Sequence, residues 1–244
     1  DVDDAYVACV EKLSISPELI REMGDKLKIV YTPLHGSGNV PVRRVLAEVG
    51  FKNVYVVPEQ EMPDPDFSTV KVPNPEDPAA LAMALALQKK LGADVAFGTD
   101  PDCDRVGIAV LDGEGCVHGL TGNQIGCLLL NYILSRRQAQ GTLPKNAAAV
   151  KSIVSTEMAR AICADYGCAM VDVLTGFKFI AEKIEQFETT GEHTFVFGFE
   201  ESCGYLSGRD VRDKDGVNAG MLIAETAAFY KKQGMTLYDG LQAL

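Results

Sequence analysis

Short apolar runs rich in β-branched residues alternate with amphipathic stretches along the chain. In the first half, the runs predict strands at residues 28–31, 53–57, 94–97 and 105–111. Stretches of helical periodicity between them predict helices at residues 40–49 and 78–91. Strand–helix–strand alternation with apolar strands indicates a mainly parallel sheet that is covered by helices on both faces.

The second of these helices carries the clearest boundary signals. Asp77 is the expected N-cap, Pro78 the expected first helical residue, and Gly92 the expected stop. Further along, Asp112-Gly-Glu-Gly115 lies between two apolar runs and predicts a hairpin turn. A hairpin adds an antiparallel edge, so the sheet is expected to be mixed.

A second series of strands and helices begins near residue 145. The pattern predicts strands at 148–154, 169–174 and 194–199, and helices from 156 (with Ser155 as N-cap), at 177–187 and at 216–232. The polar stretch 135–144 contains Gly and Pro and is expected to link the two series. We therefore expect two consecutive three-layer α/β/α domains with mixed, mainly parallel sheets. The expected division is a lead-in helix and linker at 1–24, a first domain at 25–140 and a second at 145–244.

Composition narrows the classes of partner. The chain has 244 residues, a 47% apolar fraction and a 23% charged fraction, which are globular averages. Its net charge of −11 repels phosphate backbones, so we expect neither nucleic acid nor an anionic membrane as a partner. The seven cysteines are scattered without a C-x-x-C pair and are expected to be free thiols. With an acidic start and no apolar run long enough to span a bilayer, the expected location is cytoplasmic.

The strongest chemical signal is the segment that follows the strand at 94–97. Asp100, Asp102 and Asp104 alternate there, at the strand end where open α/β sheets place ligands. Alternate carboxylates in an extended loop can converge on one hard cation, and Mg²⁺ is the default for oxygen ligands. Arg105 beside them offers a planar guanidinium for a phosphate group. A solvated acidic turn is the simpler alternative.

Two other readings of this segment can be tested on the sequence. An EF-hand loop needs Gly after its third acidic position and Glu at its twelfth, where this chain has Arg105 and Leu111. That reading fails. A phosphatase of the haloacid-dehalogenase type uses Asp-x-Asp-x-Thr or Asp-x-Asp-x-Val after a strand, and a weak match from Asp102 to Val106 survives as the alternative enzyme class. A non-catalytic module that binds metal or sugar phosphate is the third reading.

Three further clusters lie at predicted strand or helix ends. In Gly198-Phe-Glu-Glu-Ser-Cys-Gly204, Glu200 and Ser202 can present an acceptor and a donor to sugar hydroxyls. In Leu174-Thr-Gly-Phe-Lys178, the start of a helix can meet an anion. Arg212-Asp-Lys-Asp-Gly216 is a charged turn before the last long helix. Each is ordinary alone, but a cleft between the two domains that collects all of them is the economical arrangement.

Taken together, these segments resemble one known family. Thr99-Asp-Pro-Asp-Cys-Asp-Arg105 and the three clusters above occur in the order and spacing of the α-D-phosphohexomutases. Thr32-Pro-Leu-His-Gly36 and Leu120-Thr-Gly-Asn-Gln124 also look like the phosphoglucomutase branch of the phosphoglucomutase/phosphomannomutase type. The resemblance covers nearly the whole chain and implies domains II and III, the middle two of a four-domain enzyme.

The resemblance also implies roles for single residues. Asp100, Asp102 and Asp104 would hold Mg²⁺, and Arg105 and Lys214 would be catalytic, in bracing the phosphoryl group and in proton transfer or phosphate contact. The residues that would bind the sugar phosphate are Thr175, Gly176, Lys178, Glu200 and Ser202. The implied reaction interconverts glucose 1-phosphate and glucose 6-phosphate through an enzyme phosphoserine, with glucose 1,6-bisphosphate as the intermediate. Phosphomannomutase and phosphopentomutase are the alternatives within the family.

One departure from the family is large. Its members carry the phosphoserine in a Thr-Ala-Ser-His-Asn-Pro loop of the first domain and a phosphate-binding loop in the fourth, and neither pattern occurs in this chain. We therefore expect the chain to be a fragment that lacks its flanking domains and is inactive alone. A smaller departure is Asp210, where some relatives have histidine, so no histidine acid or base is assigned.

Overall fold

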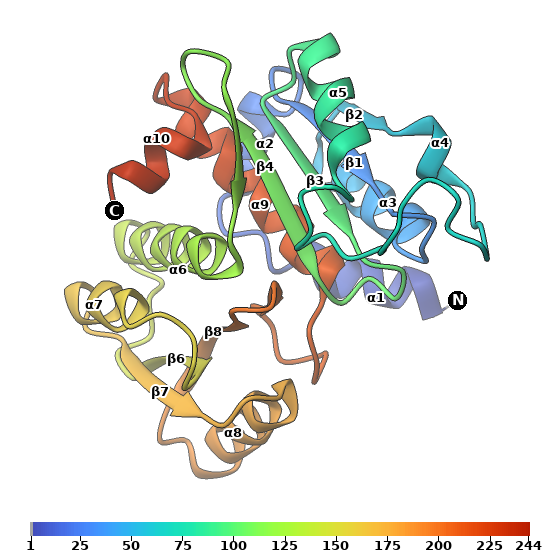
Figure 1. Cartoon of the computed structure of the whole chain (residues 1–244). Helices are drawn as coiled ribbons and strands as arrows, with labels where there is room; N and C mark the ends of the chain where they lie inside the picture. The colour runs from blue at the N-terminus through green and yellow to red at the C-terminus, as the bar shows by residue number, and fades with distance from the viewer. Residues whose placement is uncertain (1) are drawn as a thin grey trace.

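The computed structural model describes residues 2–244 and contains two β-sheets, each with helices on both faces (Figure 1). The first sheet has the strand order β2-β1-β3-β4-β5. Its strands are β1 (Lys28–Thr32), β2 (Asn53–Val56), β3 (Val95–Thr99), β4 (Val106–Leu111) and β5 (Val117–Leu120). β1 is parallel to both β2 and β3, whereas β4 is antiparallel to both β3 and β5. The sheet is therefore mixed, with the antiparallel pairs at one edge.

Side chains along β1 alternate between the two faces of the first sheet, and apolar residues on both faces explain why helices cover both. Val30 lies in one apolar cluster with Ala84 of α5 (Ala82–Leu91). Its neighbours Ile29 and Tyr31 point to the other face, which is covered by α3 (Asn39–Val49) and α9 (Gly216–Lys232). Both faces are apolar, as expected for strands that are buried on both sides.

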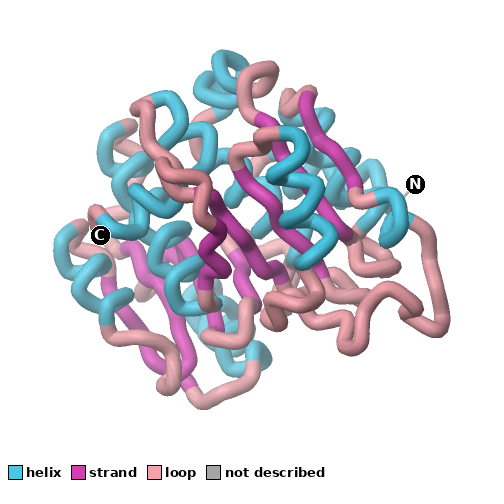
Figure 2. The backbone as a smooth tube through the Cα atoms, turned by 45° about the horizontal axis from the view of Figure 1, so that its top comes forward, coloured by secondary structure: helices cyan, strands magenta, loops and turns pink. Residues whose placement is uncertain are grey.

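The second sheet has the order β7-β6-β8-β9. Its strands are β6 (Ala147–Ser152), β7 (Ala169–Val173), β8 (Thr194–Glu200) and β9 (Gly204–Leu206). β6 is parallel to β7 and β8, and β8 is antiparallel to β9. α8 (Phe177–Thr190) covers one face, and α6 (Gly122–Ala139) and α7 (Met158–Asp165) lie on the other. Figure 2 shows the two sheets as separate sets of strands.

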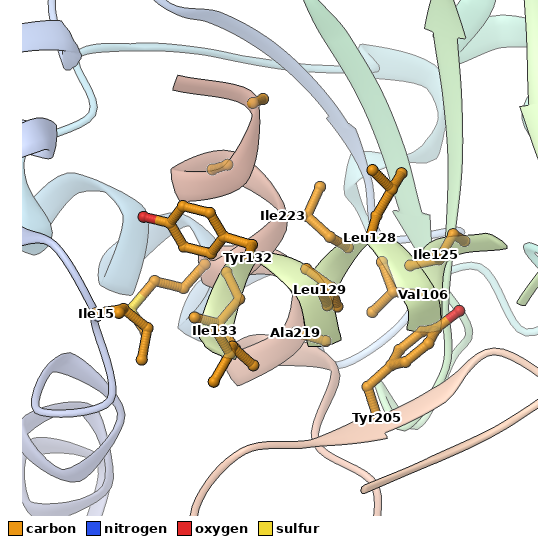
Figure 3. Packing of buried hydrophobic residues seen from close by; sticks show 14 of the residues in the cluster. Ile15, Val106, Ile125, Leu128, Leu129, Tyr132, Ile133, Tyr205, Ala219 and Ile223 are labelled. Atoms are coloured by element: carbon orange, nitrogen blue, oxygen red, sulfur yellow. The ribbon is translucent and has the colours of Figure 1, made fainter. Parts of the chain in front are cut away.

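One apolar core joins the two sheets. α6 and α9 pack against each other, and their side chains meet residues of β4 and β9 (Figure 3). The cluster includes Val106 of β4 and Tyr205 of β9, which are both almost fully buried. The remaining helices are α1 (Val2–Glu11), α2 (Pro17–Met23), α4 (Pro58–Glu61) and α10 (Leu237–Gln242). Of these, α1 packs on α3 and α2 packs on α9, so the lead-in segment is part of the same core.

Two predicted helix starts and the predicted linker were wrong. The second helix begins at Ala82, four residues after Pro78, because Asp77 caps a turn by accepting a hydrogen bond from the Ala79 N–H at 2.9 Å. α7 begins at Met158, since the Ser155 hydroxyl bonds to Glu201 and does not cap a helix. The first five residues of the predicted linker 135–144 belong to α6, which the periodicity did not reveal.

In the part of the chain that the structure describes, no helix combines the length and apolar character needed to cross a membrane.

Glu225 of α9 fastens the lead-in segment to the core. Its buried carboxylate accepts hydrogen bonds from the Ser14 hydroxyl at 2.8 Å and the Tyr132 hydroxyl at 2.8 Å. It also accepts from the backbone N–H groups of Ile15 at 3.0 Å and Ser16 at 2.6 Å. Burial raises the pKa of Glu225, and the four donors act in the opposite direction.

We expect Glu225→Ala to destabilise the chain strongly, because it leaves several buried donors without an acceptor. The expected loss is about 3 kcal/mol of unfolding free energy, which lowers the melting temperature of a chain of this size by roughly 6–12 °C. Differential scanning calorimetry measures the shift. Glu18→Ala, which removes an exposed ion pair with Arg21, should shift it by no more than about 2 °C. Equal shifts for both variants would contradict this role of Glu225.

Candidate functional site

The loop after β3 brings three carboxylates together. Asp100, Asp102 and Asp104 each offer an oxygen that lies within 4.8 Å of the others. Asp102 is exposed, Asp104 is partly exposed and Asp100 is buried at 9% exposure. The backbone turns sharply at Cys103, whose φ is 61°. Three hard oxygen donors at this spacing fit one divalent cation such as Mg²⁺.

Asp100 is the most constrained of the three carboxylates. Its Oδ1 accepts hydrogen bonds from the backbone N–H groups of Asp104 at 3.0 Å and Arg105 at 2.9 Å. Burial raises the pKa of Asp100 to about 7, the neighbouring Asp104 and Asp102 charges add to this, and the bond from Arg105 opposes it. A bound cation would lower this pKa, because it would compensate for the negative charge of the clustered carboxylates.

Two cations flank the carboxylates. Arg105 Nε lies 4.0 Å from Asp100 Oδ2 and 3.9 Å from Asp104 Oδ1, and its Nη1 lies 3.6 Å from Glu76 Oε2. Lys214 Nζ lies 2.9 Å from Asp104 Oδ2 and 2.9 Å from Asp213 Oδ1. Burial lowers the pKa of Lys214, but its bonds to Asp104 and Asp213 outweigh this and hold the pKa above its ordinary value.

The carboxylate loop is tied to the second sheet by backbone bonds. Val106 N–H donates to Cys203 C=O at 3.0 Å, and Arg105 forms an antiparallel bridge with Gly204. On the other side, Gly216 N–H donates to Cys103 C=O at 2.9 Å. The loop that carries the three carboxylates therefore lies between the two sheets and contacts the loops on both sides of β9.

Lys214 connects three of the predicted clusters. Its ammonium reaches Asp104, its methylene chain packs where a side chain on Gly204 would lie, and it sits 5.6 Å above the ring of Phe177 at the start of α8. A Cβ on Gly204 would come within 2.4 Å of Lys214 Cδ, so any side chain there would displace Lys214. Arg212, in contrast, turns away and pairs with Glu185 and Glu188 of α8.

Glu200 is the last residue of β8, and Ser202 lies in the turn between β8 and β9. Glu200 is buried at 6% exposure, and its Oε1 accepts a hydrogen bond from Gly176 N–H at 2.7 Å. The predicted clusters 198–204 and 174–178 are thus joined directly. Ser202 is partly exposed. Glu200 Oε2 has no hydrogen-bond partner among residues 2–244 and can accept a bond from a ligand hydroxyl.

The start of α8 presents the remaining predicted residues. Gly176 precedes the helix with φ of 121°, a conformation that favours glycine. Thr175 is exposed in front of it. Lys178 is also exposed, and its ammonium lies 5.1 Å above the ring of Phe179. Lys178 forms no ion pair with the carboxylate loop among the described residues, and it contributes a positive charge at the start of α8.

Sequence reasoning missed the residues that brace the carboxylate loop. Ser37 donates to Pro101 C=O from its backbone N–H at 2.8 Å and from its hydroxyl at 3.0 Å. A Cβ on Gly36 would lie 2.4 Å from Pro101 Cα, so this glycine allows the close contact. The two residues before it, Leu34 and His35, have positive φ values of 47° and 64°. The motif 32–36 was a signal for this loop, but its role could not be read without the fold.

Comparison with known proteins places both halves of the chain in one family. Residues 4–113 match the family model for phosphoglucomutase/phosphomannomutase, alpha/beta/alpha domain II, and residues 121–244 match domain III. The chain is similar to a phosphoglucomutase of Staphylococcus epidermidis, with 41% identity over 216 residues. That match covers 88% of this chain and 38% of the relative, so the chain spans about two fifths of the length of this curated relative.

Solved structures share the fold. A phosphoglucomutase of Paramecium, parafusin, matches with a TM-score of 0.69 and 18% identity, over 98% of this chain and 40% of that one. N-acetylphosphoglucosamine mutase of Aspergillus fumigatus matches with a TM-score of 0.64 and 15% identity, over 96% of this chain and 52% of that one. That mutase was solved with GlcNAc-6P and magnesium, and a variant of it with glucose 1,6-bisphosphate.

Proposed function

The chain belongs to the phosphoglucomutase/phosphomannomutase family, and we propose that it is the metal-binding and sugar-binding middle part of a phosphoglucomutase. The complete enzyme would interconvert glucose 1-phosphate and glucose 6-phosphate through a phosphoserine and a bisphosphate intermediate. The observation that carries this proposal is the bridge between Arg105 and Gly204, which joins the carboxylate loop to the loop of Glu200 and Ser202. The related phosphoglucomutase from Staphylococcus epidermidis supports glucose as the sugar.

The carboxylate loop would hold Mg²⁺ through Asp100, Asp102 and Asp104. The donor set fits the ion, since all three ligands are oxygens and converge within 4.8 Å. Mg²⁺ in this position supplies charge neutralisation for a phosphoryl group during transfer. Asp100 would be the fixed ligand, because two backbone N–H groups hold it in place. Asp102 is exposed and would complete the set.

The cations beside the loop would act on phosphate. Arg105 has its guanidinium about 4 Å from two carboxylates and is partly exposed, so it can turn toward a phosphoryl group on the open side. Lys214 is held between Asp104 and Asp213, and its raised pKa keeps it protonated at neutral pH. It would therefore contribute a positive charge and a proton to a phosphate or hydroxyl oxygen.

Sugar binding would fall to the two loops that meet at Glu200. One carboxylate oxygen of Glu200 fixes the start of α8 through Gly176, and the other can accept a sugar hydroxyl. Ser202 next to it would donate to or accept from a second hydroxyl. Thr175, Gly176 and Lys178 would contact the phosphate that is not being transferred, with Lys178 as its counter-charge.

Assay of the full-length protein that contains this chain tests the substrate. Glucose 1-phosphate, mannose 1-phosphate and ribose 1-phosphate are compared with Mg²⁺ and the matching bisphosphate present. We expect the highest kcat/KM for glucose 1-phosphate. A preference for mannose 1-phosphate or ribose 1-phosphate would move the protein to another branch of the family. Release of inorganic phosphate without isomerisation, with a trapped phospho-Asp102, would instead identify the phosphatase.

A further inference from the structure

The N-terminus of α6 lies directly against the loop that carries Glu200 and Ser202. Thr121 caps the helix in a reciprocal pair of hydrogen bonds with Gln124, which fixes Gly122 as the first helical residue. A Cβ on Gly122 would lie 2.0 Å from Glu201 O and 2.8 Å from Cys203 N. No side chain fits in that space, so glycine is needed for helix and loop to touch.

The same helix start also holds a second segment of the site. Asn123 Oδ1 accepts a hydrogen bond from Thr156 N–H at 3.0 Å. Thr156 follows the turn after β6. Ser152, the last residue of β6, and Ser155, in the turn, are both buried. Both serine hydroxyls donate to Glu201 Oε2, at 2.8 Å and 3.2 Å.

Both the backbone and the side chain of Glu201 are thus held in place. Its backbone carbonyl rests on Gly122, and its side chain is bonded to a turn that Asn123 holds in place. Its two neighbours in sequence are Glu200 and Ser202, so the position of Glu201 sets where their side chains can reach. Cys203, the next residue, has a positive φ of 64°, which shows that the loop is held in a sparsely populated backbone conformation.

We propose that Gly122 and Asn123 are positioning residues that place the sugar loop, defined as residues 200–204, from the N-terminus of α6. The proposal rests on the proposed function in one respect, since it takes Glu200 and Ser202 to be the groups that meet the sugar. Neither Gly122 nor Asn123 touches the ligand. Their contribution is geometric, and displacements of about 1 Å at a binding loop can change rates by about a hundredfold.

The first test replaces the glycine. Gly122→Ala places a methyl group against Glu201 O, whereas Gly119→Ala, three residues earlier in β5, places one in open space with nothing within 4 Å. Amide hydrogen exchange reports the order of the sugar loop, and titration with glucose 6-phosphate reports its affinity. In Gly122→Ala, we expect exchange in residues 200–204 to rise at least tenfold and affinity to fall at least tenfold. In Gly119→Ala, both should stay within twofold of the unsubstituted chain.

The second test does not depend on a steric clash. Asn123→Ala removes the acceptor for Thr156 N–H, and Asn123→Asp keeps an oxygen in its place. We expect Asn123→Ala to raise exchange in the sugar loop at least threefold and Asn123→Asp to restore it to within twofold. If Gly122→Ala does not fold, the two Asn123 variants decide the proposal. A general loss of stability would affect Asn123→Ala and Asn123→Asp alike, whereas a lost acceptor affects only Asn123→Ala.

The outcomes for the two proposals are separable. If a folded Gly122→Ala keeps the exchange rates of the unsubstituted sugar loop, or if the Asn123 variants behave alike, the positioning role is overturned. If the unsubstituted chain does not bind glucose 6-phosphate, the sugar-binding role proposed for this chain's loops fails, and exchange in residues 200–204 still decides whether α6 places the loop.

Discussion

Mg²⁺ at 10 mM should raise the melting temperature of the chain by about 3–5 °C, and Asp102→Asn should abolish the rise. A ligand that binds the folded state with a dissociation constant near 1 mM adds about 1.4 kcal/mol at this concentration, and each kcal/mol shifts a chain of this size by about 2–4 °C. Asp102 is the exposed member of the carboxylate set, so its loss removes a ligand without opening the core. Calorimetry with and without Mg²⁺ measures both values.

A matched variant separates metal binding from net charge. Asp165→Asn removes one exposed carboxylate at the end of α7, outside the carboxylate loop, and should keep the full Mg²⁺ response. Without Mg²⁺, Asp102→Asn should melt no lower than the unsubstituted chain, since it relieves repulsion among three neighbouring carboxylates. An Mg²⁺ response that persists in Asp102→Asn would remove this residue from the metal site.

The Mg²⁺ response should also depend on pH, with Asp100 setting the range. Its pKa of about 7 lies above the ordinary value of 3.8, so the proton competes with the cation below neutral pH. We expect a smaller Mg²⁺-induced shift at pH 6 than at pH 8. Without Mg²⁺, the contribution of Asp100 to stability should instead fall as the pH rises. Its folded-state pKa is raised, so this contribution is lost between about pH 4 and about pH 7. A response independent of pH would contradict this.

The fold was predictable where sequence periodicity is local. The strands at 28–32 and 194–200 and the helix at 216–232 follow runs whose pattern is complete within the element. The hairpin at Asp112–Gly115 followed from its turn residues alone. α6 was not predicted, because it is buried on most of its surface between the two sheets and therefore lacks a polar stripe.

Two predictions of helix starts were wrong for a different physical reason. Asp77 and Ser155 are good N-cap residues, but their side chains bond elsewhere in the folded chain, to a local turn and to Glu201. The second of these partners is 46 residues away, and no local pattern reveals such a bond. Tertiary contacts therefore overrode a correct local preference at Ser155.

In the candidate site too, local features were predictable from the sequence and tertiary contacts were not. The alternating carboxylates of Asp100, Asp102 and Asp104 were visible as a motif, and their convergence is present in the structure. The bond from Gly176 to Glu200 and the contact between Gly122 and Glu201 join segments that are distant in sequence. Residue type predicted which groups could do chemistry, and only the fold revealed which groups hold them in place.

The chain by itself should give no detectable conversion of glucose 1-phosphate to glucose 6-phosphate, even with Mg²⁺ and glucose 1,6-bisphosphate. Phosphoryl transfer depends on positioning and electrostatics around a group that can accept and return the phosphoryl, and neighbouring residues cannot replace that group. The loop that carries the phosphoserine in the α-D-phosphohexomutases is not among these 244 residues. A coupled assay for glucose 6-phosphate measures the turnover.

Ser37 is the serine whose behaviour could contradict this expectation. It is exposed, flanked by Gly36 and Gly38, and lies beside the carboxylate loop, but its hydroxyl donates to Pro101 C=O at 3.0 Å and so serves that loop. Turnover by the chain that Ser37→Ala abolishes would show that Ser37 is the phosphoryl carrier and that the chain is a complete enzyme. The other outcome is activity that appears only when the flanking family domains are joined to the chain and that survives Ser37→Ala. That result would place the phosphoryl carrier in those domains. The carboxylate loop and the sugar loop would then be the half of the site that this chain supplies.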